Sequence, residues 1–151
     1  MKKFNLDESL SFLIYRVHVR GLAQLRRALQ NEGFQDITPE QAALMAKLRE
    51  REGMNQSQLG HRTLKDRPNT MRILRLLKKK GYIESRSNRE SQRAKHLFLT
   101  ESGNEILDRI TPLVAKVWKS RVEGLSPEEI NMIWSILKRI SDNIERQLDK
   151  S

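Results

Sequence analysis

Basic side chains gather in one part of the chain. Between Arg62 and Lys95 there are twelve lysines and arginines and only three acidic residues, so these 34 residues carry a net charge of +9. The rest of the chain carries a net charge of +1. A solvated face that keeps a protein soluble would not require the charge to be concentrated in one segment. The block is typical of a protein that binds a polyphosphate, and it favours a nucleic acid as the partner.

Two short helices are predicted to position part of this charge. Asn55 is the candidate N-cap of a helix over about 56–64. After a tight break, Asp66 is the candidate cap of a second helix, which runs to Lys80 and ends at Gly81. This arrangement is typical of a helix-turn-helix, whose second helix enters the major groove of duplex DNA.

The second of these helices has a core side and a polar side. The residues at core spacing are Thr70, Ile73, Leu74 and Leu77, and those left facing outward are Arg67, Asn69, Met71, Arg72, Arg75 and Lys79. Arginine can make a bidentate contact to guanine, and asparagine can make one to adenine. An ordinary basic surface helix is the alternative, but the position of this helix inside the basic block favours base recognition.

A β-hairpin is predicted after the second helix. Residues 82–86 and 94–99 have strand patterns, and the polar stretch 87–92 forms the tip between them. The aromatic side chains of Tyr82 and Phe98 are expected to face the core. A basic hairpin in this position is the wing of a winged helix-turn-helix, and it would reach the DNA backbone or the adjacent minor groove.

Longer helices are predicted on both sides of this lobe. One covers residues 7–31, and another runs from a capping box at Thr38 to a stop at Gly53. Two more follow the hairpin, the first capped by Thr100 and the second opened by a capping box at Ser126. The predicted fold class is therefore mainly α, with a small β-hairpin wing.

The apolar stripes of the first and last helices are wider than one thin lobe can bury. They comprise the leucines and other apolar residues from Leu10 to Leu29, together with Ile130, Ile133, Ile136, Ile140 and Ile144. We therefore expect the helices within 5–33 and 101–150 to form a dimerisation lobe in a homodimer with two-fold symmetry. Residues 38–100 would form the winged helix-turn-helix lobe for DNA binding, within a single domain over 1–151.

The stretch from Asn55 to Gly103 resembles the MarR family of multiple-antibiotic-resistance regulators. The matching motifs are, in order, NQSQL at 55–59, DRPNT at 66–70, LKKKGYI at 77–83, RAK at 93–95, Leu97, LTE at 99–101 and Gly103. The order and length of the predicted helices match the family over essentially the whole chain. The resemblance implies a triangular homodimer whose first, fifth and sixth helices make the dimer lobe, with one recognition helix and one wing from each protomer.

The resemblance also implies a function and a set of DNA contacts. Arg93 matches the arginine that such proteins insert into the minor groove, but Ser91 stands where the family usually has an aspartate. We expect a looser wing tip, or an Arg93 held by another group. The predicted function is a sequence-specific transcription regulator that binds a pseudo-palindromic operator in double-stranded DNA and acts as a repressor released by an effector. The predicted DNA-binding residues are Ser57, Gln58, Arg67, Asn69, Thr70, Arg72, Arg75, Lys79, Arg89, Arg93 and Lys95.

Many members of the family release DNA when a small anion or a phenolic compound binds between the two lobes. Candidate residues for the lining of such a crevice are Tyr15, Arg16 and His18, and each could instead lie in the dimer interface. The three histidines, His18, His61 and His96, fall on different predicted elements and have no local ligand spacing. The sequence therefore predicts no metal and no other cofactor.

Two other classes of function compete with this interpretation. The chain has no Gly-rich phosphate loop, no HExxH motif and no nucleophile elbow, so an enzyme is not expected. A winged-helix module that binds RNA or another protein without operator specificity is the remaining alternative. RNA recognition usually relies on aromatic stacking platforms, and the basic block with the strand that ends it offers only Tyr82 and Phe98.

The composition also limits the chemistry and the location that we expect. The chain has no cysteine, which excludes disulfides, thiolate zinc sites and thiol-based sensing. No apolar run approaches the length of about 20 residues that a membrane span needs. The N-terminal apolar stretch is interrupted by Asp7, Glu8 and Arg16, unlike a signal peptide. We therefore expect a cytoplasmic protein without a membrane partner.

Overall fold

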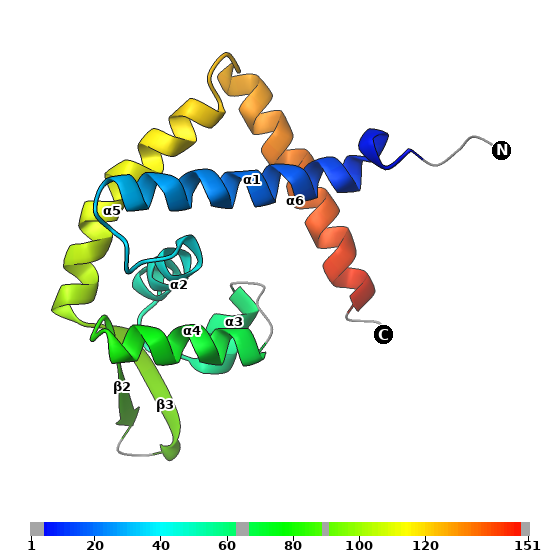
Figure 1. The fold of residues 1–151 in the computed structure, drawn as a ribbon. Coiled ribbons are helices and arrows are strands. Elements are labelled where there is room, and N and C mark those ends of the chain that lie inside the picture. Colours follow the sequence, from blue (N-terminus) through cyan, green and yellow to red (C-terminus); the bar gives the residue numbers. More distant parts are fainter. Residues whose placement is uncertain (1–4, 63–66, 89–90, 149–151) are drawn as a thin grey trace. The chain divides into compact units, whose positions relative to one another are not determined.

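The computed structural model describes residues 5–62, 67–88 and 91–148, and within 61–67 and 88–94 it describes no side chain. Its elements are, in chain order, a 3-10 helix at Leu6–Glu8, α1 Leu10–Asn31, α2 Pro39–Glu50, β1 Met54–Asn55, α3 Gln56–Arg62, α4 Arg67–Lys79, β2 Ile83–Asn88, β3 Ser91–Leu99, α5 Glu101–Arg121 and α6 Pro127–Leu148 (Figure 1). The described chain is mainly helical with one small antiparallel sheet, as predicted. None of its helices combines the length and the apolar character that a membrane span requires.

The chain divides into two compact units. The first comprises residues 1–117 and holds α1 to α4, the sheet and most of α5. The second comprises residues 118–151 and holds the end of α5 and α6. Each unit is described by itself below.

The predicted capping boxes are present and define where helices begin. The hydroxyl of Thr38 accepts a hydrogen bond from the backbone N–H of Gln41, and the side chain of Gln41 accepts one from the N–H of Thr38. The pair of Ser126 and Glu129 repeats this arrangement at the start of α6. Such reciprocal bonds satisfy backbone donors that would otherwise have no partner in the first turn.

The predicted start of the first helix is wrong by three residues. We expected a helix from Asp7, but the backbone at Ser9 is extended, with φ −76° and ψ 125°, and α1 begins at Leu10. A separate 3-10 turn precedes it, and the side chain of Asn5 accepts a hydrogen bond from the N–H of Asp7 there. The first residues are therefore attached to α1 through a bend and do not extend it.

The sheet differs from the predicted hairpin in two ways. Its strand order is β1-β3-β2, so β1 adds a third strand in which Met54 lies opposite Leu97. The hairpin strands are also longer than predicted, because residues 87–88 and 91–92, which we placed in the tip, lie in β2 and β3. The register between these strands shifts between Ser87 and Asn88. Strand pairing therefore continues almost to the end of the wing.

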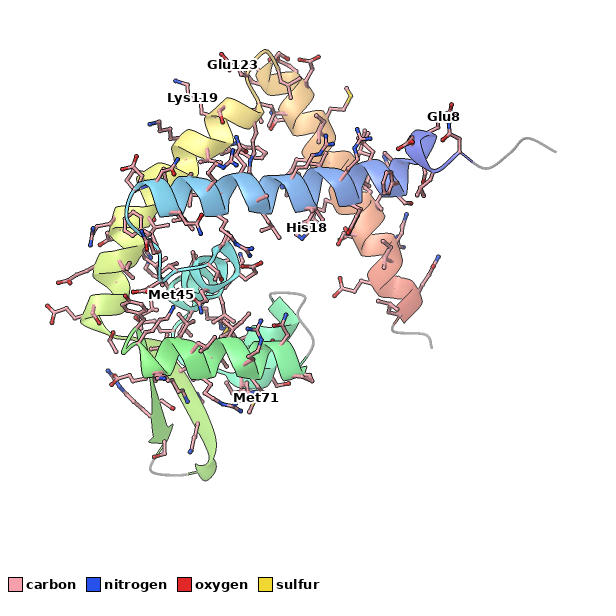
Figure 2. The ribbon with its side chains drawn as sticks, in the orientation of Figure 1. Glu8, His18, Met45, Met71, Lys119 and Glu123 are labelled. Carbon is pink, nitrogen blue, oxygen red and sulfur yellow. The ribbon has the colours of Figure 1, made fainter. Side chains whose placement is uncertain are left out.

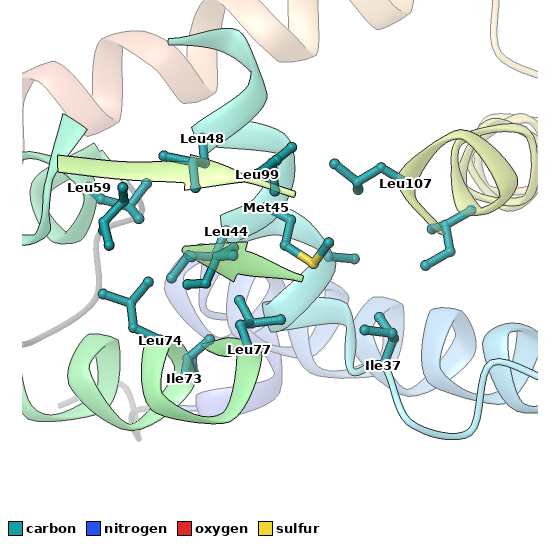
Figure 3. Close-up of a cluster of buried hydrophobic side chains, with 14 of the residues drawn as sticks. Ile37, Leu44, Met45, Leu48, Leu59, Ile73, Leu74, Leu77, Leu99 and Leu107 are labelled. Atoms are coloured by element: carbon teal, nitrogen blue, oxygen red, sulfur yellow. The ribbon is translucent and has the colours of Figure 1, made fainter. Parts of the chain in front are cut away.

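The core of the first unit lies where α2, α3, α4, α5 and the sheet meet (Figure 3). Its labelled members in the close-up are Ile37, Leu44, Met45, Leu48, Leu59, Ile73, Leu74, Leu77, Leu99 and Leu107, and all are buried. One face of α4 is thus fixed against the core, which leaves the opposite face to the surface. Burial of a leucine side chain stabilises a fold by about 1.5–3 kcal/mol, so α4 is firmly held.

The start of α5 is joined to the end of α4 through a close backbone approach at Gly103. A Cβ atom built at this glycine would lie 2.1 Å from the carbonyl oxygen of Tyr82. The Thr100 hydroxyl donates to the carbonyl of Gly81 at 2.6 Å, and the Thr100 backbone N–H donates to that of Tyr82 at 3.1 Å. Only a residue without a side chain fits here.

Candidate nucleic-acid interface

The helix α4 presents a polar and basic face to the surface. Ile73, Leu74 and Leu77 are buried, as their spacing predicts, and Arg72, Arg75 and Lys79 are exposed on the other side. Figure 2 shows Met71 on the side of α4 that lies away from α2, and its side chain is 41% exposed. The helix therefore has the form that major-groove recognition requires, with an anchored apolar face and an outward face rich in hydrogen-bond donors.

One of the predicted DNA contacts belongs to the core. Thr70 is only 1% exposed, so its side chain does not reach the surface of α4. Its spacing with the buried apolar residues already placed Thr70 on the core face. Its role is therefore packing in the core and not contact with a base. We therefore remove Thr70 from the candidate site.

Two polar residues on α4 contact each other. The Nη2 atom of Arg72 donates a hydrogen bond to Oδ1 of Asn69 over 3.0 Å. The two residues lie one helical turn apart, where side chains meet on a helix surface. Asn69 is half-buried and Arg72 is exposed, so the pair lies at the edge of the outward face.

Helix α3 carries a capping box that the sequence analysis did not identify. Oδ1 of Asn55 accepts from the backbone N–H of Gln58 at 2.9 Å, and Oε1 of Gln58 accepts from the N–H of Asn55 at 3.0 Å. Gln58 was predicted only as a DNA contact, so its carbonyl oxygen has a structural use as well. Ser57 is exposed beside it, and the amide of Gln56 contacts the sulfur of Met71, which connects α3 to α4.

The C-terminal end of α4 is attached to α2 and to the wing by two lysines. Lys80 donates to Oε1 of Gln41 over 3.2 Å and also to the carbonyl of Asp36. Lys78 donates to the hydroxyl of Ser85 on β2 over 2.5 Å. The position of the recognition helix is thus tied to the α2 cap and to the base of the wing. Sequence reasoning did not find these contacts, because each joins α4 or its end to a different element.

The outer face of the wing holds an arginine that pairs within the protein. Arg86 forms hydrogen bonds of 2.8 and 2.5 Å to the carboxylate of Glu84, and its guanidinium lies 4.6 Å from the ring centre of Phe98. The expectation that Phe98 faces the core is therefore wrong. It alternates with the buried Leu97 and Leu99 along β3, and this places its ring on the other face of the sheet, beneath Arg86.

Three predicted DNA contacts fall where no side chain is described, namely Arg67, Arg89 and Arg93, and they stay predictions. Lys95 is described and exposed on β3, opposite Ser87. The side chain of Ser91, the residue that departs from the family pattern, is not described either. The predicted contacts whose side chains are described and reach the surface, or lie partly buried at its edge, are Asn69, Arg72, Arg75 and Lys79 on α4, Ser57 and Gln58 on α3, and Lys95 on the wing; they stay candidates.

Comparison with known proteins agrees with this architecture. The model of the MarR family matches residues 37–95, the region that contains α2, α3, α4 and the wing. The chain is 26% identical over 138 residues to an uncharacterized HTH-type transcriptional regulator, YkoM, from Bacillus subtilis strain 168, and the match covers 90% of each chain. Over residues 37–95 this chain is therefore similar to the MarR family.

Two solved structures of transcription regulators have the same fold. The transcriptional repressor CouR, solved on a 23-mer DNA duplex, is 25% identical with a TM-score of 0.80, and the match covers 93% of this chain and 98% of CouR. The PcaV regulator from Streptomyces coelicolor, solved with its natural ligand, is 19% identical with a TM-score of 0.81, and the match covers 94% and 98%. The fold of these two regulators thus extends over nearly the whole chain.

A hollow of about 420 Å³ lies in the first unit of the chain. Its apolar walls come from α1, α2 and α5, and its polar lining includes Arg49, Glu50 and Thr111. Arg49 is paired with Asp108 at 2.6 Å and donates to the hydroxyl of Thr111 at 3.4 Å. Apolar walls with a few polar groups suit a small organic ligand.

The residues predicted to line an effector crevice do not border this hollow. Tyr15 and His18 are exposed on α1, and Arg16 lies 3.8 Å from Asp7. The contribution of α1 to the hollow is Leu25, two to three turns further along the helix. For these three residues, the alternative prediction of a place in the dimer interface stays open.

The histidines of the described chain form no metal site. Nδ1 of His96 lies 2.7 Å from the carbonyl oxygen of Gly53 and donates to it, since a carbonyl can only accept. His18 is exposed on α1, as Figure 2 shows, and the side chain of His61 lies outside the description. Among the described residues, no three histidines, aspartates or glutamates come together in a way that could hold a metal ion.

Proposed function

We propose that this protein is a transcription regulator that binds an operator in double-stranded DNA through α4 and the wing. The observation that carries the proposal is the two-sided character of α4. Its apolar residues are buried in the core, while Arg72, Arg75 and Lys79 are exposed together on the outward face. A helix held in this way can enter a major groove without losing its contacts to the protein. CouR, which has the same fold, was solved on a DNA duplex.

The protein acts as a homodimer. On α1, the side chains of Leu10, Leu13 and Val17 are exposed although they belong to its apolar stripe. On α6, described by itself, none of the residues is buried, and Trp134 is 65% exposed. Exposed apolar surface on this scale is typical of an interface between protein chains. The helices within 5–33 and 101–150 would bury it in a two-fold dimer, and the operator would then be pseudo-palindromic.

A small organic anion or a phenolic compound regulates the complex by binding in the hollow between α1, α2 and α5. The hollow lies next to α2, and the Gln41 side chain of α2 accepts a hydrogen bond from Lys80 just after the recognition helix. A ligand that moves α2 would therefore also move the end of α4. PcaV was solved with its natural ligand, which supports a ligand-controlled repressor.

Selection of bound sequences from random duplex DNA tests the function. We expect one enriched pseudo-palindromic sequence, with an affinity that falls steeply as salt concentration rises. The control variant is Arg75→Ala, which keeps the fold and removes one exposed cation from the outward face of α4. If single-stranded RNA of random sequence binds as tightly as the selected duplex, the operator proposal is refuted and the RNA-binding alternative is correct.

A further inference from the structure

Asn69 and Arg72 contact each other on the surface of α4. Oδ1 of Asn69 accepts a hydrogen bond from Nη2 of Arg72 over 3.0 Å. The neighbouring Ile73 is buried, so the backbone that carries both side chains is fixed. The hydrogen bond therefore joins two side chains on a rigid part of the helix.

An asparagine that reads adenine must use both halves of its amide. Its oxygen accepts from the N6 amino group of adenine, and its nitrogen donates to N7. In this protein one lone pair of the Asn69 oxygen accepts from Arg72, so an adenine amino group would have to share that oxygen with the guanidinium. The joined side chains thus offer mostly N–H donors, since an arginine has five such donors and no acceptor.

Guanine is the base whose edge matches a group of donors. Its major-groove edge presents two acceptors, O6 and N7, whereas adenine presents one acceptor and one donor. Arg72 is exposed and can direct the N–H groups that do not contact Asn69 toward these two acceptors. Because the guanidinium is oriented before DNA binds, less side-chain entropy is lost on binding.

We propose that Asn69 and Arg72 recognise DNA as one unit, in which Asn69 is a positioning residue and Arg72 contacts a guanine in each operator half-site. This inference rests on the proposed function, and it replaces the expectation that Asn69 contacts adenine by itself. Asn69 acts through the orientation of the arginine. Removal of either side chain therefore removes the same discrimination.

The first test replaces single atoms of the DNA. A duplex found by selection is prepared with 7-deazaguanine at each guanine in turn, which removes N7, and binding is measured by fluorescence anisotropy. We expect that, at one position in each half-site, replacing guanine by 7-deazaguanine lowers the affinity of the wild-type protein by about fivefold or more. Inosine at the same position is the matched control, since it keeps O6 and N7. In Arg72→Ala, guanine and 7-deazaguanine should bind equally well.

The second test measures the coupling between the two side chains. If they act as one unit, the double variant Asn69→Ala/Arg72→Ala should lose about as much affinity as Arg72→Ala alone. The matched control is the double variant Asn69→Ala/Arg75→Ala. In this control, the fold-losses of DNA affinity of the two single variants should multiply. The residue three positions before Arg75 is Arg72, which cannot accept a hydrogen bond.

A conservative variant separates positioning from direct reading. Asn69→Asp keeps an oxygen that accepts from Arg72 but has no amide N–H for adenine. It should retain the guanine preference, with a lower overall affinity because a negative charge is added near phosphate. Circular dichroism should show the same helix content for every variant.

Two results would overturn the inference, and they differ from a failure of the proposed function. One is a selected site in which adenine at one position matters only in the presence of Asn69. The other is salt-dependent duplex binding in which the losses of Asn69→Ala and Arg72→Ala simply multiply. In both cases the protein still binds its operator. A wild-type protein that binds no duplex would refute the proposed function itself.

Discussion

Replacing Gly103 by alanine tests the join between the recognition helix, the wing and α5. Gly103 lies in the first turn of α5, and alanine has a higher helix propensity by up to about 1 kcal/mol. On this ground alone the variant would be more stable than the wild type. The new methyl group, however, would lie 2.1 Å from the carbonyl oxygen of Tyr82.

That carbonyl cannot move without loss of other contacts. The backbone of Tyr82 is fixed on both sides, since its N–H donates to Leu77 at 3.0 Å and its oxygen accepts from Thr100 at 3.1 Å. Forcing a methyl group into a well-packed site costs about 1–3 kcal/mol, and loss of one hydrogen bond adds about 0.5–1.5 kcal/mol. After subtraction of the gain in helix propensity, we expect Gly103→Ala to lower the free energy of unfolding by about 0.5–3.5 kcal/mol.

Urea unfolding followed by circular dichroism measures this change. Glu105→Ala is a suitable control, because Glu105 is exposed one half-turn further along α5 and its replacement should change stability by less than about 0.5 kcal/mol. The steric reasoning would be refuted by a Gly103→Ala protein that is as stable as the wild type or more stable. Its operator affinity should also fall, since the shifted backbone connects α4 to β2.

Three further predictions follow from other parts of the structure. Lys79→Ala should reduce the salt dependence of DNA binding and leave stability unchanged. Lys80→Ala should instead lower the free energy of unfolding by about 1 kcal/mol, because Lys80, unlike Lys79, donates a hydrogen bond to Gln41. Salt titrations and urea unfolding distinguish the two variants. The pKa of Glu128 lies below its usual 4.5 because of hydrogen bonds from its own backbone N–H and from a neighbouring serine hydroxyl. Its ionised form therefore stabilises the fold above about pH 4.5, and this contribution is lost as pH falls through the lowered pKa. In Glu128→Gln, the free energy of unfolding should therefore depend less on pH in that acidic range. Ile133→Asp, a change at an exposed apolar residue of α6, should shift sedimentation equilibrium from dimer to monomer at micromolar concentration and weaken operator binding.

The features that could be predicted from the sequence are those fixed by residues close together in the chain. The capping boxes at Thr38 and Ser126 require only a hydroxyl and an amide or carboxylate three residues later. The buried face of α4 follows from the spacing of Ile73, Leu74 and Leu77. Both signals are local, and the structure confirms both.

The features that could not be predicted depend on distant parts of the chain. Met54 belongs to a two-residue strand only because Leu97 lies opposite it, and no sequence pattern of that length identifies a strand. Arg86 contacts Phe98 across two strands, so the ring does not face the core. Gln41, which was identified from sequence only as part of a cap, also accepts a hydrogen bond from Lys80, 39 positions away.

Contacts within the protein divide the basic block into two kinds of residue. Lys78 and Lys80 hold the end of α4 to the wing and to α2, while Arg86 is paired with Glu84 on the wing itself. Arg72 and Arg75 are exposed on the outward face of α4. Part of the charge therefore builds the support that orients the rest. Since each neutralised phosphate contributes about −0.9 to the salt slope, the net charge of the block overstates the number of phosphate contacts, and the geometry of α4 is the better guide to them.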